Sequence, residues 1–214
     1  AYEVNKISQT LANPTQGTIK AINRIMAWLA GDWDREFWCP RVSGNTWHLY
    51  VDSGHAGDKY RDTRSRTGVF FVLNGVPVHW RSNKQPATAT SSAAAEITAL
   101  EQAVRDAMLR WYISRDIKVK VDWPVVIMVD NQTGVIFQNK PNSRTKLAGV
   151  FDLKDKWVKE LQDQTKVKAV KIGTADNLSD MMTKGLSASI RARLYTLLQQ
   201  ILVALASAQI ASKC

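Results

Sequence analysis

Acidic residues at the ends of two strand-like runs could assemble a metal site in this chain. The apolar stretch "TWHLYV" runs into Asp52, and the stretch "PVVIMV" ends in the same way at Asp130. Asp52 taken alone is also explained as the start of a loop, because "SGHAG" is turn-like. If both strands are central and adjacent, however, the two aspartates meet at the sheet edge where open α/β proteins bind ligands.

Two further acidic positions extend this pattern. Glu96 falls in the first turns of a long helix that the sequence predicts from about Ser92, where it is not the glutamate of a capping box. Asp176 and Asp180 follow the last strand, and their spacing of four residues predicts that they share a helix face. The spacing does not choose between them, and Asp176 is the better candidate for a helix cap.

Each of these carboxylates alone fits a helix cap or a solvated surface group. A cluster of carboxylates would need a compensating positive charge, because two like charges about 4 Å apart repel by roughly 4 kcal/mol at an effective dielectric constant of 20. A divalent cation would neutralise such a cluster. Ligation by oxygen atoms alone favours Mg²⁺ or Mn²⁺ over zinc.

The elements that must position these residues follow from hydrophobic periodicity. The sequence predicts strands at 46–52, 68–73, 76–81, 124–130 and 166–172. It predicts helices at 3–12, 15–30, 92–111, 131–138, 146–162, around 176 and at 187–206. Asn74-Gly75 between two strand-like runs is a strong hairpin signal, so the first three strands are expected to be antiparallel neighbours. Three strands followed by alternating helices and strands predict a mixed sheet with helices on its faces.

The composition favours a globular protein with a polyanionic partner. The 214 residues carry a net charge of +10, which suits nucleic acid. The two cysteines, Cys39 and Cys214, have no metal-ligand spacing and favour a reducing compartment. No apolar run is long enough to span a bilayer, and no signal peptide pattern is present. The first residue is not Met, so we expect an excised part of a longer chain.

Several motifs together resemble the ribonuclease H domain of Ty1/copia-type LTR retrotransposons. The similarity is carried by "LYVDSGHAGD", "RTGVFFVLNGVPVHWRSNKQPATATSSAAAE", "VDNQ", "NSRTK" and "TADNLSDMMTKGL". Residues 1–30 are similar to the tail of the reverse transcriptase that precedes that domain. The resemblance implies a reverse transcriptase tail and linker at 1–45, a ribonuclease H domain at 46–186, and a C-terminal amphipathic helix and tail at 187–214.

The resemblance also implies a fold and an activity. The fold is a ribonuclease H-like α/β fold, with a mixed five-stranded sheet and helices on both faces. The activity is endonucleolytic hydrolysis of the RNA strand of RNA–DNA hybrids during reverse transcription, giving 5′-phosphate and 3′-hydroxyl ends. Two Mg²⁺ ions, which Mn²⁺ can replace, would act at a set of four residues in which the motif selects Asp180 over Asp176. The catalytic and metal-binding residues implied are Asp52, Glu96, Asp130 and Asp180.

The resemblance further implies partners and a location. The partners are an RNA–DNA hybrid and the reverse transcriptase domain of the same polyprotein, with no membrane, in a cytoplasmic virus-like particle. Polar residues beside the carboxylates could read the 2′-hydroxyl that marks RNA, and these are Ser91, Ser92, Asn131 and Gln132. Loop cations could contact phosphates, and these are Lys84, Lys140, Arg144 and Lys146.

Two rival functions were weighed. An integrase or transposase of the same general fold needs a late glutamate after two aspartates, whereas Glu96 comes second here. A catalytically silent domain that binds hybrids or serves as a scaffold for the reverse transcriptase is the alternative from another class.

The C-terminal helix needs a partner for its apolar stripe. Ile190, Leu194, Leu197, Ile201 and Leu205 recur at helical spacing. The flank of the sheet, the helix at 15–30 or a second copy of the chain could cover this stripe. We expect it to be covered within the chain.

Overall fold

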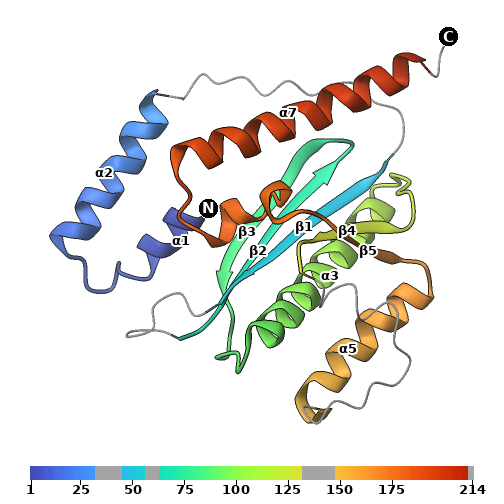
Figure 1. Cartoon of the computed structure of the whole chain (residues 1–214), viewed down its shortest axis with the longest axis horizontal. Coiled ribbons are helices and arrows are strands. Elements are labelled where there is room, and N and C mark those ends of the chain that lie inside the picture. Colours follow the sequence, from blue (N-terminus) through green and yellow to red (C-terminus); the bar gives the residue numbers. More distant parts are fainter. Residues whose placement is uncertain (32–44, 56–62, 132–147, 212–214) are drawn as a thin grey trace.

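A five-stranded sheet organises the computed structural model, which describes residues 1–31, 45–55, 63–131 and 148–211 (Figure 1). The strands are β1 (Trp47–Gly54), β2 (Arg66–Leu73), β3 (Val76–Lys84), β4 (Val125–Val129) and β5 (Val167–Lys171). Their order across the sheet is β3-β2-β1-β4-β5. The pairs β1–β2 and β2–β3 are antiparallel, and β1–β4 and β4–β5 are parallel. The predicted mixed sheet is therefore confirmed.

Helices accompany this sheet on both faces. They are α1 (Tyr2–Ser8), α2 (Gln16–Gly31), α3 (Ser92–Asp116), α5 (Ala148–Asp163), α6 (Asp180–Thr183) and α7 (Ala188–Ala211), with a 3₁₀ turn η1 (Thr174–Asp176). No helix in the described parts of the chain is long and apolar enough to cross a membrane.

The β2–β3 hairpin forms at the predicted turn. Asn74 and Gly75 both have positive φ, 51° and 84°, which is the backbone that a two-residue hairpin turn requires. The Asn74 side chain also accepts a hydrogen bond of 2.9 Å from the backbone nitrogen of Thr46. Strand β2 is buried along almost its whole length because helices cover both of its faces, and this explains its unbroken apolar run.

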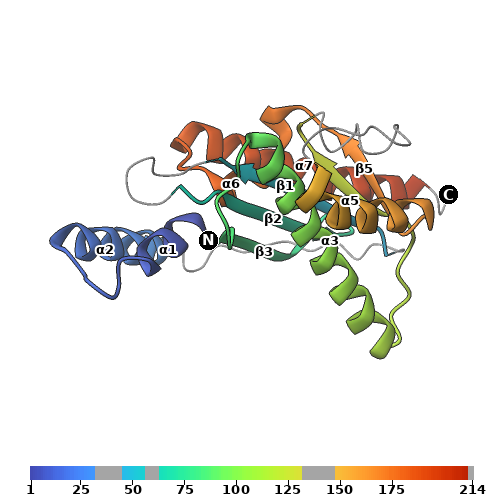
Figure 2. The ribbon, with the colours of Figure 1, turned by 90° about the horizontal axis from the view of Figure 1, so that it is seen from below.

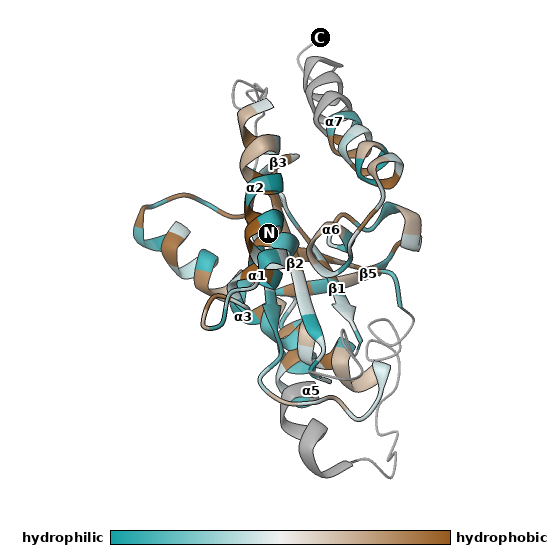
Figure 3. Ribbon diagram, turned by 90° about the vertical axis from the view of Figure 1, so that its left-hand side faces the viewer, coloured by the Kyte–Doolittle hydropathy of each residue, from teal (hydrophilic) through white to brown (hydrophobic). Residues whose placement is uncertain are grey.

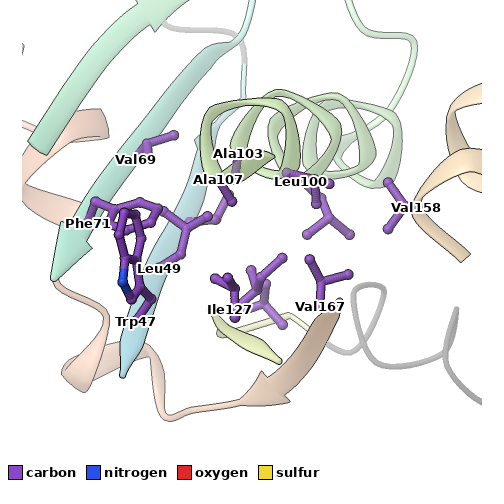
Figure 4. Close-up of a cluster of buried hydrophobic side chains, with 14 of the residues drawn as sticks. Trp47, Leu49, Val69, Phe71, Leu100, Ala103, Ala107, Ile127, Val158 and Val167 are labelled. Carbon is purple, nitrogen blue, oxygen red and sulfur yellow. The ribbon is translucent and has the colours of Figure 1, made fainter. Parts of the chain in front are cut away.

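One face of the sheet forms the larger hydrophobic core with α3 and α5 (Figure 4). Leu49, Phe71 and Ile127 are completely or almost completely buried at its centre. The Trp47 ring meets the Phe71 ring edge-on, with centroids 4.6 Å apart. Helix α3 lies across β1 and β2 on this face, so its N-terminus is held near the sheet edge that carries Asp52 and Asp130.

The opposite face of the sheet is covered by α6 and α7. Leu194 and Leu198 of α7 are 1% and 2% exposed, and they pack with Tyr50, Phe70 and Leu178. Hydrophobic and hydrophilic residues lie side by side along the described part of α7 (Figure 3). The expectation that this helix is covered within the chain is confirmed for Leu194, Leu197 and Ile201, whose partner is the flank of the sheet. Ile190 is instead 47% exposed, and the side chain of Leu205 lies outside the described residues.

The two N-terminal helices lie beside the sheet (Figure 2). Asn5 of α1 accepts a hydrogen bond from the buried guanidinium of Arg66, and the Tyr2 ring lies 5.1 Å from that guanidinium. The same guanidinium donates to Ser82 Oγ at 3.2 Å, and Ser82 Oγ donates to the Met182 carbonyl at 2.5 Å. A continuous chain of contacts therefore joins α1 to α6.

Several sequence-based boundaries differ from the structure. Strand β1 continues to Gly54, so Asp52 does not end its strand as predicted. Helix α1 ends at Ser8 rather than at residue 12, and α3 extends to Asp116 rather than to residue 111. The predicted helix at 131–138 lies outside the described residues except for Asn131, and the predicted linker at 31–45 does so except for its two end residues.

Candidate active site

The first carboxylate, Asp52, lies within β1, two residues before the end of that strand. It pairs with Gly68 on β2 and is 9% exposed. The Thr183 hydroxyl of α6 donates a hydrogen bond to Asp52 Oδ2. A charge this deeply buried needs compensation, which must come from other groups at the same place.

Asp130 follows β4 directly, as the sequence predicts. Strands β1 and β4 are parallel, and Val51 pairs with Val129 as the last residues of the shared register. Asp52 and Asp130 are each the next residue, so the two carboxylates lie side by side at one sheet edge. Burial, followed by repulsion from Asp52, raises the pKa of Asp130 above its ordinary value.

Asp180 is brought to the same edge by a loop that is fastened to β1. The Asn177 side chain donates a hydrogen bond of 3.0 Å to the Val51 carbonyl, and its own oxygen accepts one of 2.6 Å from Ser179 Oγ. These contacts place Asp180 at the first position of α6. Burial raises the pKa of Asp180, and repulsion from Asp52 acts in the same direction.

Asp52, Asp130 and Asp180 form the carboxylate cluster. Each supplies an oxygen atom, and these oxygens all lie within 4.8 Å of one another. Burial first, and then repulsion between the carboxylates, raises the pKa values of Asp130 and Asp180. The all-oxygen donor set fits a hard divalent cation such as Mg²⁺ or Mn²⁺.

Asp176, the sequence rival of Asp180, lies elsewhere. It ends the 3₁₀ turn η1, and its Oδ1 lies 3.1 Å from the Arg193 guanidinium on α7. Gly173 rather than Asp176 is the residue that caps η1, and Ser179 is the one that caps α6. The predicted shared helix face was wrong because η1 and α6 are separate elements.

Glu96 lies near the cluster but is not one of its three members. It occupies the second turn of α3, and its Oε1 accepts a hydrogen bond from the Asn131 side chain. Asn131 follows Asp130 directly, so this contact ties α3 to the end of β4. The structure thus brings together three of the four predicted carboxylates and connects the fourth to them through Asn131.

The structure describes only some of the residues that were predicted to contact nucleic acid. Ser91 is the N-cap of α3, where its Oγ accepts a hydrogen bond of 3.1 Å from the Ala94 nitrogen, so the prediction of Ser92 as the cap was wrong. Ser92 is exposed at the start of that helix, and Lys84 ends β3. Four of the predicted contacts lie outside the described residues, and they are Gln132, Lys140, Arg144 and Lys146.

Lys184 is a member of this site that the sequence analysis missed. Its ammonium lies 2.7 Å from Asp180 Oδ1 and 3.5 Å from Asp52 Oδ2. Burial opposes the charge on Lys184, but the hydrogen bond to Asp180 and the surrounding carboxylates outweigh it and raise the pKa of Lys184. Its spacing of four residues from Asp180 was the available signal, because such pairs meet on a helix.

Gly68 allows α6 to approach β2 closely. A Cβ atom at this position would lie 2.5 Å from Thr183 Cγ2 and 2.9 Å from both Met182 Cβ and the Ser179 carbonyl oxygen. Two of these neighbours are a Cβ and a backbone oxygen that cannot move independently of α6. Gly68 therefore sets the distance between Asp52, which it faces, and the helix that carries Asp180.

The substitution Gly68→Ala should push α6 away from β2. We expect a loss of about 1–3 kcal/mol of stability from the overpacking and a weaker affinity for Mn²⁺, measured by thermal melting and calorimetric titration. Gly185→Ala is the matched control, because its nearest neighbour would lie at 3.6 Å, which is ordinary contact. Equal effects of the two substitutions would contradict this account.

Metal binding should weaken on acidification at a pH above the usual aspartate range. A cation binds deprotonated carboxylates, and the pKa values of Asp130 and Asp180 are raised from 3.8. The same raised values stabilise the metal-free protein below the ordinary pKa, and this contribution is lost as the pH rises through the folded-state values. The difference in melting temperature with and without Mn²⁺ should therefore shrink as pH falls, with the decline starting above pH 3.8. A decline confined to lower pH would refute the raised values.

The order of the strands, with an acidic cluster where β1 and β4 end, defines a ribonuclease H-like α/β fold. The chain is similar to retrovirus-related Pol polyproteins of plant transposons. The retrovirus-related Pol polyprotein from transposon RE1 of Arabidopsis thaliana is 27% identical over 189 residues, which is 87% of this chain and 13% of that protein. Pol polyproteins of two other plant transposons match over a similar span.

The chain is also similar to a secreted effector protein and to a solved ribonuclease H structure. The secreted RxLR effector protein 161 of Plasmopara viticola is 32% identical over 120 residues, covering 56% of this chain and 82% of that protein. The solved structure of LC11-RNase H1 in complex with an RNA/DNA hybrid superposes with a TM-score of 0.47 at 19% identity, covering 64% of this chain and 93% of that one. No protein family profile matches the chain. The chain spans about 13% of the length of the curated Pol polyproteins that it matches.

Proposed function

We propose that this chain hydrolyses the RNA strand of RNA–DNA hybrids during reverse transcription of a copia-type element. The observation that supports this most directly is the convergence of Asp52, Asp130 and Asp180 at one edge of a ribonuclease H-like sheet. The relationship to retrotransposon Pol polyproteins supplies the biological setting. The products would be 5′-phosphate and 3′-hydroxyl ends.

The side chains have separate tasks in this proposal. Asp52, Asp130 and Asp180 hold the metal ions, and Glu96 completes the set from α3. Two bound Mg²⁺ ions would supply a water of lowered pKa and neutralise the charge that develops on the leaving oxygen. Thr183 orients Asp52 through its hydroxyl, and Asn177 fixes the loop before Asp180.

Substrate recognition divides between the RNA sugar and the phosphates. Polar side chains near the cluster read the 2′-hydroxyl, which only RNA offers, and these are Ser91, Ser92, Asn131 and Gln132. Basic side chains contact phosphates without reading sequence, and these are Lys84, Lys140, Arg144 and Lys146. The net charge of +10 supports association with a polyanion of this kind.

The polyprotein context completes the proposal. Residues 1–45 would continue from the reverse transcriptase, which would deliver the hybrid to the site, and residues 46–186 would form the ribonuclease H domain with 187–214 as a C-terminal extension. Docking of α1 on Arg66 supports close association of the N-terminal segment with the sheet. The working location would be a cytoplasmic virus-like particle.

A hybrid with separately labelled strands tests this function. We expect cleavage of the RNA strand in Mg²⁺ or Mn²⁺, no cut in the DNA strand, and no cleavage in EDTA. Single-stranded RNA and duplex DNA of the same sequence are the controls, because the proposal requires the hybrid. Tight binding of the hybrid without any metal-dependent cleavage would favour a silent binding or scaffold domain instead.

A further inference from the structure

Lys184 places a positive charge inside the carboxylate cluster. Its ammonium contacts two of the three cluster members, at 2.7 Å from Asp180 Oδ1 and 3.5 Å from Asp52 Oδ2. These contacts join Lys184 to oxygens of the same residues that offer ligand atoms to a cation. The Lys184 ammonium and a divalent ion would therefore compete for the same carboxylates.

Lys184 is more exposed to solvent than the two carboxylates that it contacts. The side chains of Asp52 and Asp180 are 8% and 12% exposed, whereas that of Lys184 is 41% exposed. Asp52 is held in β1 and accepts the Thr183 hydroxyl, and Asp180 begins the neighbouring helix α6, so the fold keeps the two carboxylates close despite their repulsion. Lys184 follows α6 at its end, and its long flexible side chain can turn out to solvent.

Arg66 is another basic residue, at the start of β2. Arg66 is buried, and its guanidinium contacts Asn5 and Ser82. Among the described residues, Lys184 is the cation for which ion pairs with cluster members are found. Removing its charge would leave the carboxylates at the same separation with less compensation.

We propose that Lys184 is the resident counter-ion of the carboxylate cluster and that a divalent cation must displace it to bind Asp52 and Asp180. This inference rests on the proposed metal site and goes further by assigning a competitor to it. Lys184 stabilises the metal-free protein, and it lowers the affinity of the cluster for metal by the same interaction. The two effects are reciprocal, because both derive from one ion-pair network that bound metal replaces.

Calorimetric titration of the full chain with Mn²⁺, together with thermal melts in EDTA and in saturating Mn²⁺, tests this proposal. Lys184→Met should bind Mn²⁺ roughly three- to tenfold more tightly than the unaltered chain, the range expected when one partly exposed ion pair is lost. Lys184→Met should also melt at a lower temperature than the unaltered chain in EDTA. Its melting temperature should rise more than that of the unaltered chain when Mn²⁺ is added. Lys184→Arg keeps the charge and should bind Mn²⁺ much as the unaltered chain does.

Lys168→Met is the control for net charge, because Lys168 is an exposed residue of β5 and the substitution removes one positive charge away from the cluster. It should leave the affinity for Mn²⁺ unchanged. Unaltered chain that binds no Mn²⁺ would overturn the metal site itself. If the unaltered chain binds Mn²⁺ and Lys184→Met binds it equally well or more weakly, the proposed competition between Lys184 and the metal is wrong. An increase in affinity in Lys168→Met equal to that in Lys184→Met would also overturn the competition.

Discussion

The substitution Asp130→Asn should almost abolish cleavage of the RNA strand, with a fall in rate of about 10²–10³-fold, the range seen when one main electrostatic group of an active site is removed. Asparagine keeps the size of the side chain but not its negative charge, so one ligand to the metal is weakened. Asp130 follows β4 directly and shares no register pair of the β1–β4 ladder, so the fold should persist. The rate of hybrid cleavage and the far-ultraviolet circular dichroism spectrum measure the two effects.

Asp176→Asn is the matched control for this experiment. Asp176 belongs to the same acidic loop, but its side chain is 52% exposed and is directed to Arg193 on α7. We therefore expect cleavage close to that of the unaltered chain. Full activity of Asp130→Asn at the same Mg²⁺ concentration would remove Asp130 from the catalytic set, and loss of activity in Asp176→Asn would reopen the choice of carboxylates.

The substitution Leu194→Ala should lower stability by about 2–5 kcal/mol, the range for truncating a buried leucine. Leu194 is 1% exposed and packs from α7 onto Tyr50, Phe70 and Leu178. For a chain of this size we expect a fall in melting temperature of roughly 4–20 °C. Thermal melts followed by circular dichroism provide the measurement.

Ile190→Ala is the control on the same helix, because Ile190 is 47% exposed. Its melting temperature should fall less than that of Leu194→Ala, since less buried surface is lost. If Leu194→Ala melted like the unaltered chain but changed the oligomeric state on a sizing column, α7 would instead serve as an interface between copies.

The sequence patterns predicted the sheet well because each strand carries its own local signal. Asn74-Gly75 determines a hairpin by its backbone preference alone, and the apolar runs of β2 and β4 predict burial. The convergence of Asp52 and Asp130 also follows from local patterns, once their strands are assumed to be neighbours. What was missed depends on contacts between distant segments.

Local sequence patterns did not indicate the roles of three residues, which are Gly68, Asn177 and Lys184. Gly68 matters only because α6, more than a hundred residues later in the chain, lies against it. Asn177 acts through the Val51 carbonyl, 126 residues away in sequence. The expected shared helix face of Asp176 and Asp180 was wrong for a related reason, because a spacing of four residues has meaning only within a single helix, and η1 and α6 are separate.

The chain of contacts from α1 to α6 has a consequence for how this protein can be shortened. A fragment that begins at the first strand would delete Asn5 and Tyr2 and would leave the buried Arg66 without these two contacts. Ser82, which links Arg66 to the Met182 carbonyl, would then hold a less constrained guanidinium. Expression boundaries drawn at β1 would therefore separate Arg66 from the contacts that α1 supplies.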